Sequence, residues 1–407
     1  MPYEFTSTGL EMQEKVRNFM DYAIYPNEET YYEQEEELGP SGYPPVMDKL
    51  KALAFERGLW NLFLPHLNPA NPGTPLSNLD FAPISETLGR VLFASEALNC
   101  SAPDTGNMEI LNLYGSDTVK RDWLAPLLEG EIRSAFSMTE PDSASSDASN
   151  ISLSIRRDGD EYVLNGRKWF SSGAVAERCK VLIVMGKTDP DAPAHRQQSM
   201  IVVPKDSPGV TIGMEPSIFG YNHRGGHPEV IYRDARVPAD NLLGEEGSGF
   251  AIAQARLGPG RIHHCMRALG VAERALELMT RRSLERSTFG QTLAHRSNIQ
   301  DWIAESRIEI DMAREYVLRT AHRMDTEGNK AAATSISGIK VAIPQVVAKV
   351  IDRAIQVHGA AGVTQFTPLA SMYGLARTLR IVDGPDEVHK MTIARREIRK
   401  YQGDFRY

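Results

Sequence analysis

Cysteine is scarce in this sequence of 407 residues. The three cysteines, Cys100, Cys179 and Cys265, lie far apart and show no Cys-x-x-Cys spacing. An odd number at such spacings predicts neither a disulfide framework nor a zinc ribbon, and it fits a reducing compartment best. Basic residues form no block, and the formal net charge is -8. Nucleic acids and anionic membrane surfaces are therefore not expected as partners.

The sequence also shows no run that approaches the roughly 18 apolar residues of a membrane span. The first residues, MPYEFTSTGLEMQEKVRNFM, contain no apolar signal core, and acidic residues appear early, which disfavours an Arg-rich transit peptide. The last residues, DFRY, do not resemble the Ser-Lys-Leu peroxisomal address. We expect a cytoplasmic protein, with an organelle matrix as the alternative.

The common phosphate-binding and metal-binding patterns are missing as well. There is no G-x-x-x-x-G-K-[S/T] string, and the glycine-rich stretch 244–249 neither follows a clear strand nor opens a βαβ unit, which disfavours a Rossmann-type nucleotide site. His223 and His227 lie in an Arg-Gly-Gly loop rather than on a helix, and the adjacent His263 and His264 cannot both face one ion. We expect no metal site.

What the sequence does contain is two changes of hydrophobic period. Residues 1–134 show helical spacing, residues 135–243 show short alternating runs with Asp-Gly and Asn-Gly turns, and residues 244–407 show long helical stretches. We predict an α+β fold with an N-terminal α-helical domain, a middle β-barrel or sandwich domain and a C-terminal four-helix bundle. Apolar faces left over on the bundle helices predict a homo-oligomer, either a homodimer or a homotetramer.

Short strings in these segments carry the functional signal. They are FSMTEPDSASSD at 136–147, KWFSSG at 168–173, LGPGRIHH at 257–264, ERSTFG at 285–290 and IQVHGAAG at 355–362. Each alone has an ordinary explanation, such as a hydroxyl-rich loop, a tryptophan in a β core or a helix end. Together and in this order they resemble the acyl-CoA dehydrogenase family over essentially the whole chain.

The resemblance implies FAD as the cofactor and an acyl-CoA thioester as the substrate. Carried over residue by residue, it places the following residues at FAD: Phe136, Met138, Thr139, Trp169, Ser171, Arg286, Phe289, Gln356, Gly359, Ala360, Pro385 and Glu387. It places Ser145, Ser146, Arg261, His264 and Gly384 at the substrate. In the family, the R-x-T-F-G segment reaches the FAD of a neighbouring subunit. Because the loop after Thr139 is one residue longer than the family's T-E-P-G-A-G-S-D, the carry-over between 142 and 146 is open by one position.

The catalytic position departs from the family pattern. The family commonly has a glutamate base in a Y-E-G-T string, whereas Asp383 occupies the matching place in VDGPDEVH, residues 382–389. The resemblance implies that Asp383 abstracts the α-proton and that flavin N5 accepts the β-hydride, which yields a trans-2-enoyl-CoA. The structural alternative is a helix cap, since Asp383 or Asp386 precedes a helical run.

The DGPDEVH string, with CSAPDTGN at 100–107, resembles one subgroup of the family. Its animal members carry a fused kinase-like domain, and here the dehydrogenase-like part is expected to fill the chain. The implied substrates are fatty acyl-CoAs of β-oxidation or modified ones, for example 4-oxygenated. An electron-transferring flavoprotein is the implied electron acceptor. Two alternatives are a flavoprotein that eliminates a leaving group from a substituted acyl-CoA and a non-catalytic acyl-CoA-binding protein.

Overall fold

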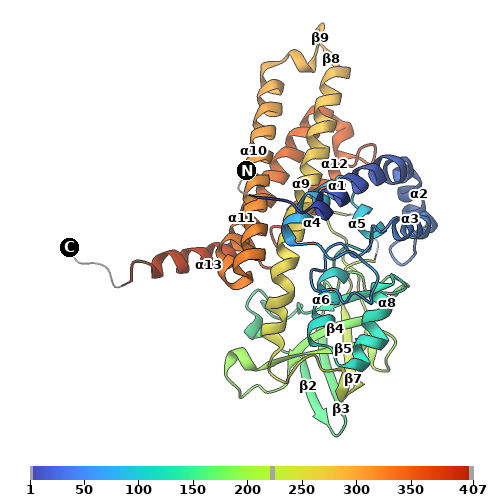
Figure 1. Cartoon of the computed structure of the whole chain (residues 1–407), viewed down its shortest axis with the longest axis vertical. Coiled ribbons are helices and arrows are strands. Elements are labelled where there is room, and N and C mark those ends of the chain that lie inside the picture. Colours follow the sequence, from blue (N-terminus) through green and yellow to red (C-terminus); the bar gives the residue numbers. More distant parts are fainter. Residues whose placement is uncertain (1–2, 221–224, 403–407) are drawn as a thin grey trace. The chain divides into compact units, whose positions relative to one another are not determined.

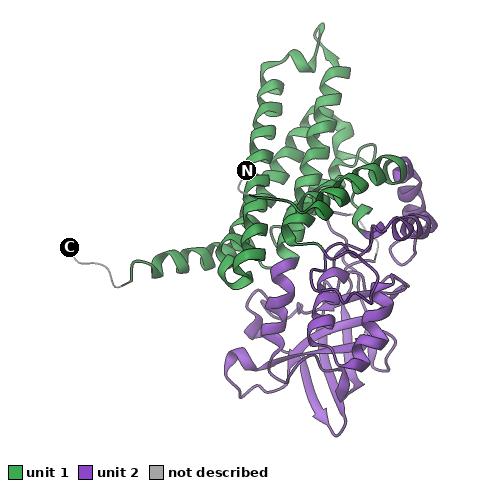
Figure 2. Ribbon diagram, viewed as in Figure 1, with its two compact units in different colours: residues 1–25, 76–95, 260–407 green, residues 26–75, 96–259 purple. Residues whose placement is uncertain are grey.

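The computed structural model describes residues 3–220 and 225–402. Helices precede residue 129, strands occupy the stretch from 133 to 238, and long helices follow from 249, which confirms the predicted order (Figure 1). The chain forms two compact units (Figure 2): unit 1 comprises residues 1–25, 76–95 and 260–407, and unit 2 comprises residues 26–75 and 96–259. Because the N-terminal helices are divided between both units, the domain boundaries predicted near 134 and 243 stay a prediction.

Unit 2 is built around a curled sheet (Figure 1). Within the described residues its strands are β1 (Arg133–Ser137), β2 (Ser154–Asp158), β3 (Glu161–Lys168), β4 (Cys179–Lys187), β5 (Gln198–Pro204), β6 (Val210–Ile212) and β7 (Val230–Pro238). The order is β1-β4-β2-β3-β7-β6, and β5 pairs with β4. Strands β1 and β4 run parallel, whereas the β2–β3, β3–β7, β4–β5 and β6–β7 pairs are antiparallel. The predicted middle β domain is confirmed.

The sequence pattern explains the sheet. Strands β4 and β5 are almost continuous apolar runs and are buried along nearly their whole length, as expected of strands covered on both faces. The turn between β2 and β3 has two residues, and Gly159 at its first position has φ 65°. A glycine with positive φ at that position matches the tight hairpin turns that follow the twist of paired strands.

Unit 2 also contains helices. They are α2 (Glu28–Leu38), α3 (Pro45–Glu56), α6 (Asp104–Tyr114), α7 (Asp117–Val119), α8 (Ala125–Leu128) and the start of α9 (Gly249–Glu285), with a π-helical turn at Lys120–Leu124. The short helix α5 (Ala94–Ala97) is divided between the two units. The CSAPDTGN string ties α6 to β1: Asp104 Oδ1 accepts a hydrogen bond from the Ser134 amide at 2.7 Å, and Asn107 Nδ2 donates to Ser134 Oγ at 2.9 Å. This subgroup motif is therefore structural within unit 2.

Unit 1 is helical. It contains α1 (Ser7–Phe19) with a π-helical turn at Met20–Ile24, α4 (Asn78–Gly89), most of α9, α10 (Ser297–Glu327), α11 (Asn329–His358), α12 (Leu369–Thr378) and α13 (Asp386–Arg399). A two-stranded hairpin, β8 (Ser287–Thr288) and β9 (Gln291–Thr292), joins α9 to α10. Helix α11 packs against α10, α12 and α13, and its buried residues recur at helical spacing. This arrangement confirms the predicted C-terminal helical domain.

One apolar stretch differs from the sequence expectation. Within Ser297–Val363 an 18-residue window has a mean hydropathy of 1.3, enough by length and composition alone to cross a membrane. Half of that window is buried inside the structure. A core helix of a bundle has the same composition, because it buries its side chains against neighbouring helices. The window therefore gives only weak support for a membrane span.

Helices α4 and α9 touch backbone to backbone inside unit 1. A Cβ atom at Gly270 would collide with the carbonyl oxygen of Glu86 and would lie 2.8 Å from Gly89 Cα. A Cβ atom at Gly89 would in turn collide with the carbonyl oxygen of Arg267. Glycine at both positions is thus what lets the two helices approach so closely.

The substitution Gly270→Ala is therefore expected to destabilise unit 1. Backbone atoms cannot move aside as a side chain can, so the helices must separate, at a cost of about 2–3 kcal/mol in the free energy of unfolding. Urea unfolding followed by circular dichroism measures the loss. The control Leu284→Ala, at an exposed position on α9, should change stability by less than about 0.5 kcal/mol. An unchanged unfolding midpoint in the Gly270 variant would contradict the close crossing.

Candidate active site

Asp383 lies in the loop between α12 and α13. Its φ is 55° and that of Gly384 is 99°, so both residues adopt left-handed backbone conformations. A non-glycine residue pays a strain cost there, and such strain gathers at functional sites. Helix α13 has Pro385 as its N-cap residue and no capping hydrogen bond from a side chain. Asp383 therefore does not act as the helix cap that the sequence left open.

Asp386 does not cap the helix through its side chain either. Its carboxylate is buried and accepts hydrogen bonds from Arg380 Nε at 2.8 Å and Gln345 Nε2 at 3.1 Å. The Asp386 amide donates to the carbonyl oxygen of Arg380 at 3.1 Å. These bonds close the loop that carries Asp383 and attach it to α11.

Two side chains donate hydrogen bonds to the carbonyl oxygen of Asp383. Arg261 Nε donates to it at 2.9 Å, and His389 Nε2 lies 3.2 Å from it. A carbonyl oxygen only accepts, so Nε2 of His389 carries the proton. Burial lowers the pKa of His389 to about 4, and the charges of Arg261 and Lys340 act in the same direction. His389 is therefore a neutral donor that fixes the backbone of the loop.

Lys340 on α11 also contacts the backbone of this loop. Its Nζ donates to the carbonyl oxygen of Leu379 and lies 3.4 Å from that of Gly384. The side chain is buried, and burial lowers the pKa of its ammonium group. Burial likewise lowers the pKa of Arg261. Together with His389, these side chains set the backbone of the loop in the strained conformation of Asp383.

The Asp383 carboxylate faces helix α9. His264 Nε2 lies 3.3 Å from Asp383 Oδ2, with side-chain exposures of 23% and 17%. One turn earlier, a Cβ atom at Gly260 would lie 3.7 Å from the same oxygen. Of the predicted substrate residues, the structure thus brings Arg261, His264 and Gly384 together at Asp383. Arg261 contacts the backbone of Asp383 through its Nε, which the sequence could not specify.

The other predicted residues of unit 1 lie at the β8–β9 hairpin, at the end of α11 and at the start of α13, beside the Asp383 loop. Arg286 and Phe289 lie at the β8–β9 hairpin (Figure 1), where Phe289 is 99% exposed and has φ 48°, followed by Gly290 with φ 82°. Gln356, Gly359 and Ala360 are exposed at the end of α11 and in the turn that follows it. Pro385 and Glu387 begin α13, and Glu387 is exposed.

In unit 2 a buried ion pair organises the loop after β1. Lys168 Nζ lies 2.8 Å from Glu140 Oε1 and donates to the carbonyl oxygen of Met138 at 2.8 Å. Glu140 also accepts from the amides of Ser152 and Leu153, both at 2.8 Å. Burial opposes the ionisation of Glu140, but the charge of Lys168 and these hydrogen bonds outweigh it and lower the pKa of Glu140 to about 2. Burial lowers the pKa of Lys168 to about 8 despite Glu140, so both groups are charged at neutral pH.

Glu140 should make the stability of unit 2 fall in acid. Its folded pKa of about 2 lies below the ordinary 4.5, so its contribution is complete above 4.5 and is lost as the pH falls toward 2. We expect the free energy of unfolding, measured by urea titration from about pH 5.5 to 3.5, to fall with pH in the wild type and to fall less steeply in the double variant Glu140→Gln/Lys168→Met. At the acidic end of this range the two slopes should differ by the equivalent of about one proton bound on unfolding. An equal slope in both proteins would show that Glu140 is not ionised preferentially in the folded state.

The KWFSSG string begins with Lys168 of this ion pair. The Trp169 amide donates to the carbonyl oxygen of Thr139 at 3.0 Å, and Ser171 Oγ lies 2.8 Å from Ser137 Oγ. The Nε1 of Trp169 is buried and makes no hydrogen bond in the described structure. A buried unpaired donor is costly, and a polar heterocycle beside the half-buried indole would satisfy it. This orphaned donor fits the flavin that the sequence predicts there.

The remaining predicted residues of unit 2 occupy this loop and its strand. The ring of Phe136 packs under the Arg256 guanidinium, whose carbon lies 3.9 Å from the ring centroid. Ser145 Oγ accepts from the Glu140 amide at 2.9 Å and so shapes the loop, whereas Ser146 is exposed. The structure therefore gives Ser145 an internal partner and leaves Ser146 accessible.

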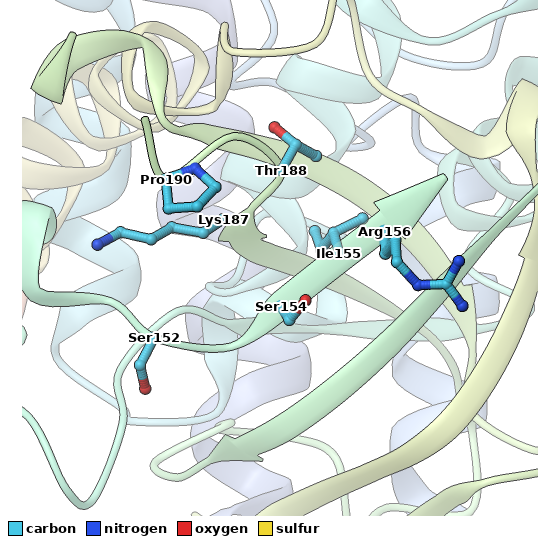
Figure 3. A pocket seen from close by; sticks show the side chains of 7 residues that line it. All are labelled: Ser152, Ser154, Ile155, Arg156, Lys187, Thr188 and Pro190. Atoms are coloured by element: carbon cyan, nitrogen blue, oxygen red, sulfur yellow. The ribbon is translucent and has the colours of Figure 1, made fainter. Parts of the chain in front are cut away.

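A surface pocket of about 350 Å³ opens beside this loop (Figure 3). It is lined by Ser152, Ser154, Ile155, Arg156, Lys187, Thr188 and Pro190. The side chains of Arg156 and Lys187 extend in opposite directions from the hollow (Figure 3). Cations and hydroxyl groups at separate places suit a ligand with more than one anionic group.

Sequence reasoning missed several residues of these sites. No recognisable motif contains Lys340 or the pocket residues Arg156 and Lys187. His389 lies in the DGPDEVH string, but the sequence assigned no role to it. Glu140 and Lys168 bordered predicted residues, but their pairing spans 28 positions of sequence. Among residues 3–220 and 225–402, no group of three or more His, Cys, Asp or Glu side chains could hold a metal ion, and His223 lies outside those residues.

Comparison with known proteins agrees with this geometry. Residues 6–131, 135–234 and 247–398 match the N-terminal, middle and C-terminal domains described as acyl-CoA dehydrogenase. "Probable acyl-CoA dehydrogenase FadE2" of Mycobacterium tuberculosis is 53% identical and covers 100% of this chain and 99% of the relative. "Acyl-CoA dehydrogenase family member 11" of Homo sapiens is 51% identical over 97% of this chain and 51% of the relative. The chain thus spans about half the length of this animal relative.

Solved structures show the same fold. A structure from Mycobacterium abscessus superposes with a TM-score of 0.94 at 46% identity and covers 98% of this chain and 100% of that chain. The acyl-CoA dehydrogenase of Geobacillus kaustophilus has a TM-score of 0.83 at 28% identity, with the same coverage. The predicted family, fold class, enzyme class and FAD cofactor are confirmed. The chain belongs to the acyl-CoA dehydrogenase family of FAD-dependent oxidoreductases.

Proposed function

We propose that this protein dehydrogenates an acyl-CoA thioester between the α and β carbons, with Asp383 as the base. The observation that carries the proposal is the Asp383 carboxylate, which lies in a strained loop whose backbone is held by Arg261, Lys340 and His389. A base must be placed within hydrogen-bond reach of the proton it removes, and a loop held at its carbonyl oxygens supplies that placement.

The protein's own residues set up the reaction in two places. In unit 1 the Asp383 carboxylate accepts the α-proton, and at 17% exposure its side chain is largely screened from water. In unit 2 the Thr139, Trp169 and Ser171 positions would hold the flavin, and the Glu140–Lys168 pair keeps their loop in shape. When bound, FAD supplies the acceptor for the β-hydride.

We propose further that the pocket beside β2 and β4 takes the phosphates of coenzyme A. Its Lys187 and Arg156 are cations, and Ser154 offers a hydroxyl donor, which matches the separate phosphate groups of the coenzyme.

Lys187→Ala should therefore raise KM for an acyl-CoA about tenfold, the loss of one charge-assisted hydrogen bond. The KM of the corresponding acyl-pantetheine, which has no phosphorylated nucleotide, should not change. Steady-state kinetics with both substrates measures the difference. Lys180→Ala, an exposed position on β4 outside the pocket, is the matched control. An equal rise of KM for both substrates would exclude phosphate recognition by Lys187.

The experiment that tests the whole proposal is an anaerobic titration of the FAD-loaded protein with straight-chain, branched and 4-oxygenated acyl-CoAs. Loss of the flavin's visible absorbance with one class establishes dehydrogenation and names the substrate class. Product formation without a change of absorbance would indicate elimination of a leaving group. Neither product nor absorbance change with any thioester would leave acyl-CoA binding as the function.

Two partners belong to the proposal. Phe289 is exposed in a left-handed conformation, and a second copy of the chain, in a homodimer or homotetramer, would cover such an apolar ring. Arg286 on the same hairpin would then reach the FAD of that copy. An electron-transferring flavoprotein is proposed as the electron acceptor on the basis of family membership.

A further inference from the structure

A chain of three side chains ends at the Asp383 carboxylate. Arg267 Nη2 lies 3.1 Å from His264 Nδ1, and His264 Nε2 lies 3.3 Å from Asp383 Oδ2. Arg267 and His264 are three residues apart on α9, so their side chains share one face of the helix. All three residues belong to unit 1.

The chemistry of Arg267 determines the proton on His264. A guanidinium has donors only, so Nδ1 of His264 is the acceptor, and a neutral imidazole then carries its single proton on Nε2. That proton points to an ionised carboxylate, which only accepts. Every hydrogen bond from Arg267 through His264 to Asp383 therefore runs in the same direction, and His264 is neutral.

The groups around the pair are consistent with a neutral imidazole. Burial lowers the pKa of His263 to about 3, with the charge of Arg267 acting in the same direction, and burial lowers the pKa of His389 to about 4. Burial raises the pKa of the Cys265 thiol to about 12. These neutral groups, and the positive charges of Arg261, Arg267 and Lys340, face the pair from α9, α11 and α13. A positive charge on His264, added to these three, would be unfavourable there.

We propose that His264 is a positioning residue for the base rather than a substrate contact; this rests on the proposed role of Asp383. Its Nε2 proton holds Oδ2 and thereby sets the plane of the carboxylate. When the base works, the α-carbon–hydrogen bond breaks and an oxygen–hydrogen bond forms on Asp383, while His264 keeps its proton throughout. Aspartate is one methylene shorter than the glutamate usual in the family, so its orientation matters more for reach.

The test measures the proton step by itself. The FAD-loaded enzyme is incubated in D2O with a 3-thia-acyl-CoA, whose sulfur acidifies the α-proton and replaces the β-carbon, and α-proton exchange is followed by NMR as a function of pH. His264→Leu should slow exchange about 10- to 100-fold. It should also move the acidic midpoint of the exchange profile up by about one to two pH units, because a hydrogen bond to the charged form of a base lowers its pKa.

The variant His264→Gln, which keeps an N–H donor, should restore most of the rate and return the midpoint toward the wild-type pH. His322→Leu, on α10 beside Tyr3, is the control and should leave both unchanged. If His264→Leu leaves the rate and the midpoint unchanged, or if the glutamine variant loses as much as the leucine variant, the positioning role is overturned. If Asp383→Asn exchanges as fast as the wild type, the proposed base itself is wrong.

Discussion

Asp383→Asn is expected to lower kcat about 100- to 10,000-fold while FAD content and thermal stability stay close to those of the wild type. Removal of a general base commonly costs this much, because the carboxylamide cannot accept the α-proton. The amide has nearly the same shape as the carboxylate, and the backbone contacts of Arg261 and His389 are to the carbonyl oxygen, which the substitution leaves in place. Stopped-flow reduction of the bound flavin by the substrate found in the titration gives the rate.

The matched control is Asp352→Asn, which removes an exposed carboxylate from α11. It should leave kcat within twofold of the wild type, since a distant surface charge contributes little to the site. A wild-type rate in the Asp383 variant would show that another group removes the proton, and the strained loop would then need a different explanation.

Lys168→Met is expected to lower the free energy of unfolding by about 3–5 kcal/mol and to release FAD. The substitution leaves the Glu140 carboxylate ionised in a buried place without its cation, and an uncompensated buried charge is among the most costly defects in a protein. It also removes the donor to the Met138 carbonyl oxygen, and with it one of the bonds that shape the loop beside Trp169. Urea unfolding and the flavin absorbance retained after gel filtration measure the two effects.

The double variant Glu140→Gln/Lys168→Met separates charge from packing. It should recover at least half of the lost stability, because no charge is then left buried and unpaired. Lys180→Met, at an exposed position of β4, should change stability by less than about 0.5 kcal/mol. A double variant as unstable as Lys168→Met would mean that packing of the lysine stem, and not its charge, stabilises the loop.

The sequence by itself determined the order of the structure and the identity of the family. Hydrophobic period is a local property, so the change from helical to alternating spacing near residue 135 and back near 249 could be recognised without knowledge of the fold. The DGPDEVH string also directed attention to Asp383. The string could not decide between a catalytic base and a helix cap, because an acidic residue just before a helix is compatible with either role.

Only the tertiary structure decided what surrounds that acid. Arg261 and Asp383 are 122 positions apart, and Lys340 and Gly384 are 44 apart, so no local pattern could predict that these side chains hold the carbonyl oxygens of one loop. Likewise, Glu140 follows the predicted flavin residue Thr139 and Lys168 precedes Trp169, but the pairing of Glu140 with Lys168 depends on how β3 returns beside the loop after β1. Local spacing determines helices and strands, whereas a site requires packing to bring distant polar groups within about 3 Å of one another, a distance set by hydrogen bonding.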